Sequence, residues 1–206
     1  MASLPKTRYT PEQYLEIDRK AEHRSEYVNG EIRAMAGASR EHNLIVTNLV
    51  RELSLRLRGQ PCETYSNDMR VTISLVRYAY PDVVIACNHP QFIDGQLDTL
   101  TNPSVIIEVL SSTTQNDDRS WKFAHYRRLA TLTDYVMLSQ YQPFAEHYAR
   151  QSDNQWVLTE LSGLEAVLLL PSLGCELSLA DIYERIEFTP DPDMPALELW
   201  KNEPQG

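Results

Sequence analysis

Two acidic residues lie in stretches of sequence that are otherwise mostly apolar. Glu108 interrupts NPSVIIEVLSS, residues 102–112, whose aliphatic and β-branched side chains suit the buried middle of a strand. Asp82 stands near the start of a similar run, YPDVVIAC, residues 80–87. Burying an unpaired carboxylate costs several kcal/mol or forces it to hold its proton. Glu108 therefore needs a partner, a cation or a catalytic role.

The two acidic strands could bring their carboxylates together. Side chains alternate along a strand, so Glu108 is expected to share a face with Ile106 and Leu110. If the strands are neighbours, Asp82 and Glu108 would repel each other unless a divalent cation lies between them. Hard oxygen ligands with open coordination positions suit Mg²⁺ or Mn²⁺ rather than zinc. Such an ion polarises a phosphoryl oxygen and lowers the pKa of a bound water.

Local signals predict the elements of the N-terminal part. Thr10 is a candidate N-cap for a helix over residues 10–21, with proline at the first helical position. Asn29-Gly30 is a two-residue turn signal and predicts a hairpin over residues 26–35. A broad apolar face at helical spacing predicts a long helix over residues 39–58.

The rest of the chain alternates between strands and helices. We expect a loop over residues 88–103, a second long helix over 115–130 and a short final helix over 177–186. Expected strands are 62–67, 69–76, 78–87, 104–110, 133–139, 144–151, 155–161 and 166–171. This order predicts one α/β domain, residues 1–188, with a central mixed β-sheet flanked by helices. A Pro-rich tail, residues 189–206, follows it.

Composition limits the class of protein and its partners. The chain has 206 residues and a net charge of −10, which is awkward for nucleic-acid binding, although a local basic patch can exist in an acidic protein. No apolar run approaches the ~20 residues of a membrane span, and the N-terminus has no secretory h-region, so we expect a cytoplasmic protein. Cys62, Cys87 and Cys175 lack zinc-site spacing and are expected to be three reduced, buried thiols.

Five motifs, in order, resemble those of a known family. The proline before Asp82 and the glutamate in the strand at 108 match the PD-(D/E)xK nuclease superfamily. The closer resemblance is to the Uma2 family, also called DUF820, a set of restriction-endonuclease-like proteins abundant in cyanobacteria. It covers roughly residues 8–188. The motifs are EYVNGEI (26–32), MAGASREHN (35–43), YPDVVIAC (80–87), NPSVIIEVLSSTTQNDDRSWKFAHYRRL (102–129) and DYVMLSQ (134–140).

The resemblance implies a restriction-endonuclease-like core and a set of site residues. The superfamily places a lysine two residues after the strand carboxylate, but this chain has Leu110 there. The Uma2-like pattern supplies a lysine from the following helix, Lys122, which would orient or deprotonate the attacking water or offset phosphate charge. Glu26 matches by position the acidic residue that completes the metal site. His42 could touch phosphate or relay a proton, and Asp68 could line the same cleft.

Each of these residues also has a plain structural interpretation. Glu108 could be a buried acid paired with a basic side chain, and Asp82 a turn residue at the entry to a strand. Lys122 could be a solvated helix lysine, and Glu26 could serve local hairpin electrostatics. For His42 a half-buried histidine with a satisfied hydrogen-bond partner is favoured over a functional role.

The expected function is a Mg²⁺- or Mn²⁺-dependent endonuclease that hydrolyses phosphodiester bonds of nucleic acid, with DNA favoured. Asp82, Glu108 and Glu26 would hold the metal, and Lys122 and His42 would complete the catalytic set. The alternative is a non-catalytic module that keeps the nuclease-like fold for binding or assembly; the absence of lysine at position 110 and the acidic charge motivate it. A homodimer is expected in either case.

Overall fold

The largest sheet of the computed structural model has six strands in the order β11-β10-β9-β8-β6-β3. Strands β8 and β9 run parallel and the other neighbours antiparallel, so the predicted mixed sheet is confirmed. The structure describes residues 7–35, 37–111 and 115–190, and the predicted tail lies outside them from residue 191 onward. The six strands are β3 Cys62–Ser66, β6 Val83–Cys87, β8 Val105–Leu110, β9 Asp134–Ser139, β10 Phe144–Arg150 and β11 Trp156–Ser162.

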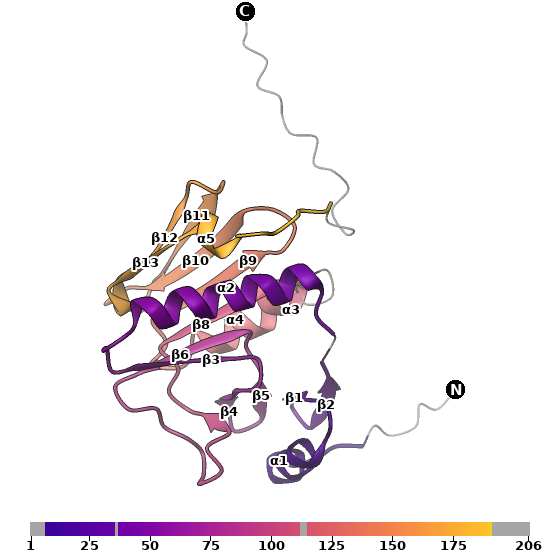
Figure 1. The fold of residues 1–206 in the computed structure, drawn as a ribbon. Helices are drawn as coiled ribbons and strands as arrows, with labels where there is room; N and C mark the ends of the chain where they lie inside the picture. Colours follow the sequence, from indigo (N-terminus) through magenta and orange to yellow (C-terminus); the bar gives the residue numbers. More distant parts are fainter. Residues whose placement is uncertain (1–6, 36, 112–114, 191–206) are drawn as a thin grey trace, which may run out of the picture.

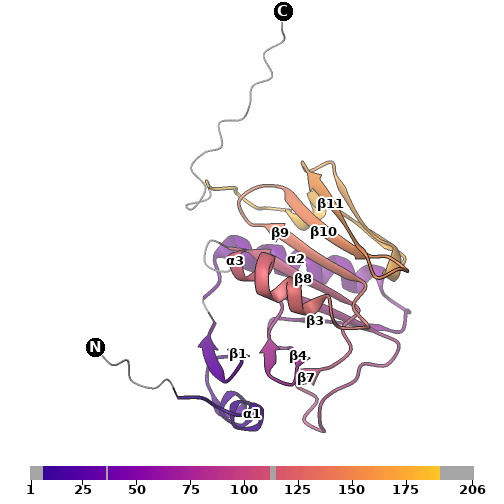
Figure 2. The same cartoon turned by 180° about the vertical axis from the view of Figure 1, so that it is seen from behind.

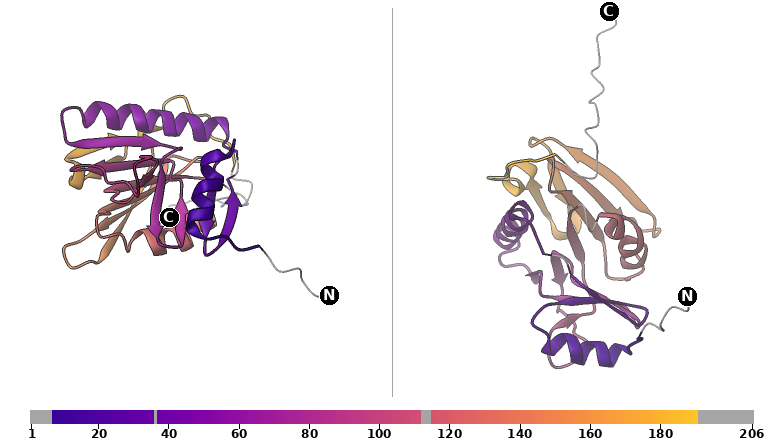
Figure 3. Two further views of the ribbon diagram at one scale, coloured as in Figure 1. Left: turned by 90° about the horizontal axis from the view of Figure 1, so that it is seen from below. Right: turned by 90° about the vertical axis from the view of Figure 1, so that its right-hand side faces the viewer.

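Helical segments cover both faces of this sheet (Figures 1 and 3). Helix α2, Arg40–Arg56, packs on one face over a core that includes Val83 and Ile107. The helical segment that follows β8 lies on the opposite face (Figure 2), over the core that contains Ile106. Because both faces are covered, all of β8 is buried and Glu108 is only 2% exposed.

The first two helices begin where capping signals place them. Helix α1, Pro11–Lys20, has a capping box in which the Thr10 hydroxyl accepts the Gln13 N–H and the Gln13 side chain accepts the Thr10 N–H. Ser39 caps α2 by accepting the N–H of His42. Both predicted helices are confirmed: α1 was predicted from its N-cap signal at Thr10, and α2 from its apolar face.

A second sheet of five strands, ordered β2-β1-β5-β4-β7, packs against α1 below the large sheet (Figure 1). Asn29 and Gly30 join β1 to β2 with φ of 51° and 92°, which confirms the predicted hairpin. The loop prediction for 88–103 was wrong at Thr99–Leu100, which pair in parallel with β4. The strands are β1 Ser25–Val28, β2 Glu31–Ala34, β4 Arg70–Ser74, β5 Arg77–Ala79 and β7 Thr99–Leu100.

The single strand predicted for residues 78–87 is two strands in different sheets. β5 ends at Ala79 in the small sheet, and β6 begins at Val83 in the large sheet. Pro81 lies in the break, where it has no N–H to donate to either ladder. The chain therefore crosses from one sheet to the other immediately before β6, and Asp82 stands at this crossing.

The long helix predicted for residues 115–130 is shorter and irregular. It consists of α3, Gln115–Asp117, a π-helical turn, Asp118–Lys122, and α4, Phe123–Tyr126. The hydroxyl of Tyr135, on β9 beneath it, donates to the carbonyl oxygen of Asp118 at 3.1 Å. A side chain that donates a hydrogen bond to a helix carbonyl oxygen disturbs the regular backbone hydrogen bonds of the helix, which is one cause of π-helical turns.

The C-terminal part differs from the expectation of a helix over 177–186. Strand β12, Val167–Leu170, pairs with β13, Cys175–Ser178, as a separate hairpin joined by a 3₁₀ turn, Pro171–Leu173. Helix α5 is limited to Leu179–Ile182. Residues 177 and 178 belong to the strand because Leu177 pairs opposite Leu168 and is fully buried there.

The expectation of three reduced cysteines was wrong for two of them. Cys62 on β3 lies directly opposite Cys87 on β6, and a disulfide joins them, whereas Cys175 is free. Their separation of 25 residues concealed a pairing that only the sheet register creates.

Removing this disulfide is expected to destabilise the fold. Replacing both Cys62 and Cys87 with serine should lower the free energy of unfolding by about 3 kcal/mol, because the unfolded chain regains the entropy of an open loop. Urea unfolding of the variant and the parent, with and without reductant, measures this. Cys175→Ser is the control and should leave the reductant effect intact. An unchanged midpoint in the double variant would contradict the prediction.

One buried and one partly exposed ion pair hold α1 to the small sheet and to the residue before β7. Asp18 and Arg70 are 0% and 1% exposed and lie 2.7 Å apart, and the Tyr80 hydroxyl also donates to Asp18. Arg19 donates to both carboxylate oxygens of Asp98, at 2.7 and 2.9 Å. This bidentate bond, opposed by partial burial, lowers the pKa of Asp98 to about 2.

The contact between Arg19 and Asp98 is expected to make the free energy of unfolding depend on pH. The folded-state pKa of Asp98 is lower than the ordinary value of 3.8. The stabilisation that Asp98 provides is therefore fully present above pH 3.8 and is lost as pH falls through about 2. Because the pair is partly exposed, we expect a loss of only about 1 kcal/mol. Urea unfolding between pH 5 and pH 2 measures it. Asp98→Asn should remove this part of the fall in unfolding free energy with falling pH. A variant whose unfolding free energy falls with pH as steeply as that of the parent would contradict the prediction.

In the ranges that the structure describes, no helix is long and apolar enough to cross a membrane.

Candidate functional site

Asp82 and Glu108 meet where β6 and β8 run side by side. Val83 pairs with Ile107, so the preceding residue, Asp82, lies beside Glu108 across the two strands. The Asp82 N–H donates to Glu108 Oε2 at 3.4 Å, and the Val109 N–H donates to Asp82 Oδ2 at 2.7 Å. Both side chains line the same cavity. The structure therefore brings together the two carboxylates that the sequence singled out.

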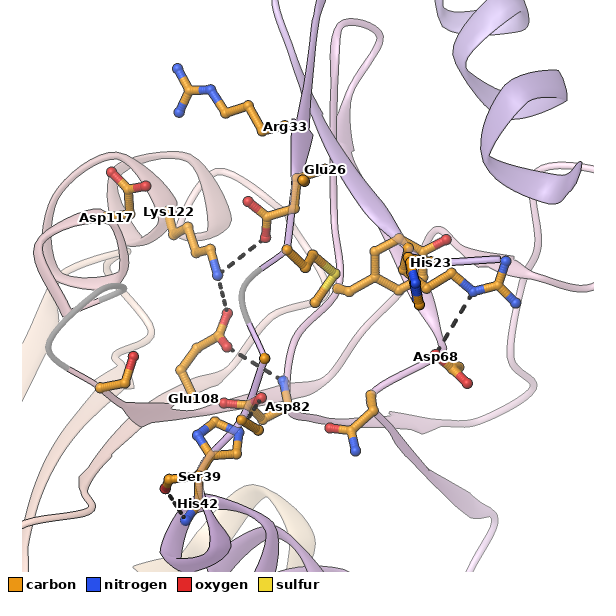
Figure 4. A pocket seen from close by; sticks show the side chains of 18 of the residues that line it. His23, Glu26, Arg33, Ser39, His42, Asp68, Asp82, Glu108, Asp117 and Lys122 are labelled. Carbon is orange, nitrogen blue, oxygen red and sulfur yellow. Dashed lines mark hydrogen bonds and ion pairs between the residues drawn. The ribbon is translucent and has the colours of Figure 1, made fainter. Parts of the chain in front are cut away.

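The cavity lies between the two sheets and has a volume of about 990 Å³. Its wall includes the hairpin β1–β2, the N-terminus of α2 and residues 22–24. Glu26, His42, Asp68 and Lys122 also line it, so all the predicted site residues reach one space (Figure 4). At the rim, Asp68 lies 3.8 Å from the guanidinium of Arg24.

Lys122 points into the site and not into solvent. It is 6% exposed, and its Nζ lies 3.3 Å from Glu108 Oε1, 3.3 Å from Glu26 Oε1 and 2.9 Å from Asp118 Oδ1. Figure 4 shows the ammonium between the carboxylates of Glu26 and Glu108. The interpretation of Lys122 as a solvated helix lysine is therefore wrong, because the π-helical turn faces the sheet.

Burial and charge together shift the titration of this cluster. Burial raises the pKa of Glu108 well above its ordinary value; Lys122 opposes the shift, and Asp118, Asp82 and Glu26 add to it. Burial acts to lower the pKa of Lys122, but Glu108, Asp118 and Glu26 outweigh it and raise that pKa. One ammonium thus faces three carboxylates, with Asp82 beside them, and the cluster favours a further cation or a proton.

His42 contacts Asp82 from the first turn of α2. Its Nε2 lies 3.0 Å from Asp82 Oδ1, and its backbone N–H donates to the Ser39 hydroxyl oxygen. Ser39 in turn donates to the side-chain oxygen of Gln140 at 2.8 Å, which ties the N-terminus of α2 to the end of β9. His42 therefore has the hydrogen-bond partner that the structural interpretation requires. That partner belongs to the site, so the contact also fixes the orientation of Asp82.

Glu26 enters the site from the hairpin of the small sheet. It lies on β1 opposite Arg33 of β2 and is half-buried at the edge of the cavity. Its contact with Lys122 links the small sheet to the π-helical turn that packs on the large sheet. Its role as a metal ligand stays a prediction.

The donor chemistry of the cavity fits a hard divalent cation held by two carboxylates. Asp82 and Glu108 offer oxygen ligands on one face, and Mg²⁺ commonly binds through one or two carboxylates with water in the other positions. Within 7–35, 37–111 and 115–190, no three His, Cys, Asp or Glu side chains are already arranged around an ion position. Glu26 is engaged by Lys122, so the pair Asp82–Glu108 is the part of the predicted ligand set that fits best.

Asp118 is a site residue that the sequence prediction missed. It is 1% exposed and makes the shortest of the Lys122 contacts. The signal was present in the sequence, because Asp118 and Lys122 are four residues apart and such pairs meet on one helix face. Ser39 and Gln140 were also missed, because their contact joins positions 101 residues apart.

Known proteins resemble this chain over most of its length. The model of the Uma2 family, described as "Putative restriction endonuclease", matches residues 11–181. The uncharacterised protein sll1609 of Synechocystis sp. is 39% identical over 158 residues, 76% of this chain and 89% of its own length. The uncharacterised protein slr1290 of the same organism is 29% identical over 187 residues, 90% of this chain and 97% of its own length.

A solved structure shares the fold. It is the crystal structure of a DUF820 protein from Anabaena variabilis ATCC 29413, with a TM-score of 0.71 and 16% identity, covering 85% of this chain and 97% of that one. The predicted α/β architecture is thus confirmed by a solved example. Since the family model spans nearly the whole of both sheets and the cavity between them, this chain belongs to the Uma2 family.

Proposed function

We propose that the chain is a divalent-metal-dependent endonuclease that hydrolyses phosphodiester bonds of nucleic acid, with Mg²⁺ or Mn²⁺ as cofactor and DNA as the favoured substrate. The observation that carries the proposal is the meeting of Asp82 and Glu108 beside the Lys122 ammonium, inside one large cavity. The family description, "Putative restriction endonuclease", supports it. The Anabaena protein of the same fold, described as a "putative nuclease", supports it as well.

The side chains of the site have distinct roles in this proposal. When bound at Asp82 and Glu108, the cation would polarise a phosphoryl oxygen and lower the pKa of a water. The Val109 N–H and His42 hold the two oxygens of Asp82, so its orientation is set before any ligand arrives. Lys122 would donate to the attacking water or to a phosphate oxygen, where negative charge grows during the reaction.

The direct test is cleavage by the purified chain. Supercoiled plasmid and labelled single- and double-stranded oligonucleotides of DNA and RNA are incubated with Mn²⁺, Mg²⁺ or excess EDTA. The proposal expects nicked or linear products with Mn²⁺ or Mg²⁺ and none with EDTA. A preparation that binds Mn²⁺ but cuts none of these substrates would contradict it.

A second candidate is a non-catalytic module that retains the fold for binding or assembly. The observation that favours it is the engagement of Lys122 with Glu26, Glu108 and Asp118, because the ammonium already occupies oxygens of two predicted metal ligands. The two candidates differ in metal binding. A ligand that binds only the folded state raises the melting temperature, so an endonuclease should melt higher in Mn²⁺ and the non-catalytic module should not.

A further inference from the structure

Asp118 lies behind Lys122 as seen from the cavity. Lys122, Glu26 and Glu108 line the cavity, whereas Asp118 is not among its described lining residues and is 1% exposed. Its Oδ1 lies 2.9 Å from Lys122 Nζ, closer than the other two carboxylates at 3.3 Å. Asp118 therefore contacts the ammonium from the protein side, and Glu26 and Glu108 contact it from the cavity side.

The backbone of Asp118 is anchored to the sheet. Its carbonyl oxygen accepts a hydrogen bond from the hydroxyl of Tyr135, which is fully buried on β9. Strand β9 is the parallel neighbour of β8, the strand that carries Glu108. The Tyr135 contact thus fixes the π-helical turn relative to Glu108. Asp118 and Lys122 both lie on that turn, so their backbone positions are fixed with it.

An exposed Glu–Lys ion pair on α1 provides a comparison for the buried Asp118–Lys122 pair. Glu16 and Lys20 have the same four-residue spacing and an Nζ–O distance of 2.7 Å, but their side chains are 70% and 74% exposed. An exposed pair of this kind contributes little. Burying two charges is costly unless the geometry compensates, so the buried Asp118–Lys122 pair depends on the contacts that hold it in place.

A metal at Asp82 and Glu108 would change the surroundings of Lys122. Glu108 would then be shared with a divalent cation, whose charge repels the ammonium. Asp118 is outside the candidate ligand pair, so its contact with Lys122 does not depend on whether a cation is present. It can therefore oppose the displacement of the ammonium when the cation binds.

We propose that Asp118 is a positioning residue for Lys122: it holds the ammonium at the cavity from behind, including when Glu108 binds a cation. The functional part of this inference rests on the proposed endonuclease activity. The positioning itself does not, and it can be measured without any cleavage.

The first experiment measures how readily Lys122 reacts. The full chain and its Asp118→Asn variant undergo brief reductive methylation, and peptide mass spectrometry gives the modification of Lys122 relative to the exposed Lys20. In the parent, Lys122 should react far more slowly than Lys20. In Asp118→Asn its rate should rise by about fivefold or more, because the ammonium leaves its buried position more often.

Matched variants make this readout specific. Glu16→Gln removes the carboxylate from the exposed pair and should leave the Lys122 rate unchanged. Tyr135→Phe removes only the hydroxyl that anchors the π-helical turn and should raise the Lys122 rate by about twofold. Lys122 rates equal to those of the parent in both Asp118→Asn and Tyr135→Phe would overturn the proposal.

The second experiment separates positioning from metal binding. With Asp118→Asn, the Mn²⁺ affinity measured by calorimetry should stay within about threefold of the parent, since Asp82 and Glu108 are intact. The kcat for oligonucleotide cleavage should fall by about tenfold or more with KM little changed, because Lys122 is no longer held in place. Unchanged kcat alongside a faster Lys122 reaction would overturn the functional part. A parent that cuts nothing would instead count against the endonuclease proposal and leave the reactivity result standing.

Discussion

Replacing Asp82 with asparagine or Glu108 with glutamine is expected to reduce Mn²⁺-dependent cleavage by about 10²- to 10⁴-fold. Each change removes one negative charge from the pair that would hold the cation but keeps the size of the side chain. The Val109 N–H can still donate to the carbonyl oxygen of an asparagine at position 82. Cleavage rates on a labelled duplex measure the loss of activity. The Mn²⁺-induced rise in melting temperature measures the loss of metal binding.

The controls for this prediction use the same chemical changes at exposed positions. Asp153→Asn, in the loop before β11, and Glu16→Gln, on α1, should cleave like the parent. The prediction fails if Asp82→Asn and Glu108→Gln retain both the Mn²⁺ shift and the parental rate. If the parent shows the Mn²⁺ shift but never cleaves, and Asp82→Asn and Glu108→Gln lose that shift, the result would support metal binding without catalysis.

Replacing Lys122 with methionine is expected to lower the free energy of unfolding by about 3–5 kcal/mol in the absence of metal. The substitution keeps the length of the side chain but leaves Glu108 and Asp118, 2% and 1% exposed, without the ammonium between them. A buried carboxylate that loses its cation must take up a proton or weaken the fold. Urea unfolding followed by tryptophan fluorescence, in EDTA, measures the change.

Two further variants decide whether the loss comes from the unpaired carboxylates. Lys20→Met removes the ammonium of the exposed pair on α1 and should not change the unfolding midpoint measurably. Adding Glu108→Gln to Lys122→Met should recover part of the loss, because one buried charge disappears with its partner. If Lys122→Met unfolds like the parent, or if the second change makes the loss larger, the ammonium does not stabilise this cluster.

Local features of the fold were predictable because their causes lie within a few residues. The Thr10 capping box depends on side chains that bond to the nearest backbone groups, and the Asn29-Gly30 turn on residues that tolerate positive φ. Helix α2 was predicted from the spacing of its own apolar residues. The alternation along β8 also placed Glu108 on the face of Ile106. The helix over 115–130 was predicted too regular because a distant element, Tyr135, took over the carbonyl of Asp118.

The sequence by itself determined the types of the reactive groups and the local elements that carry them. It indicated a carboxylate within each of two apolar strands and a lysine on the next helical segment. Only the tertiary structure decided that the chain changes sheets around Pro81, that Cys62 faces Cys87, and that Asp118 supports Lys122 from behind. Sheet register and burial depend on contacts between residues far apart in the chain, and a single sequence does not specify which distant groups will meet.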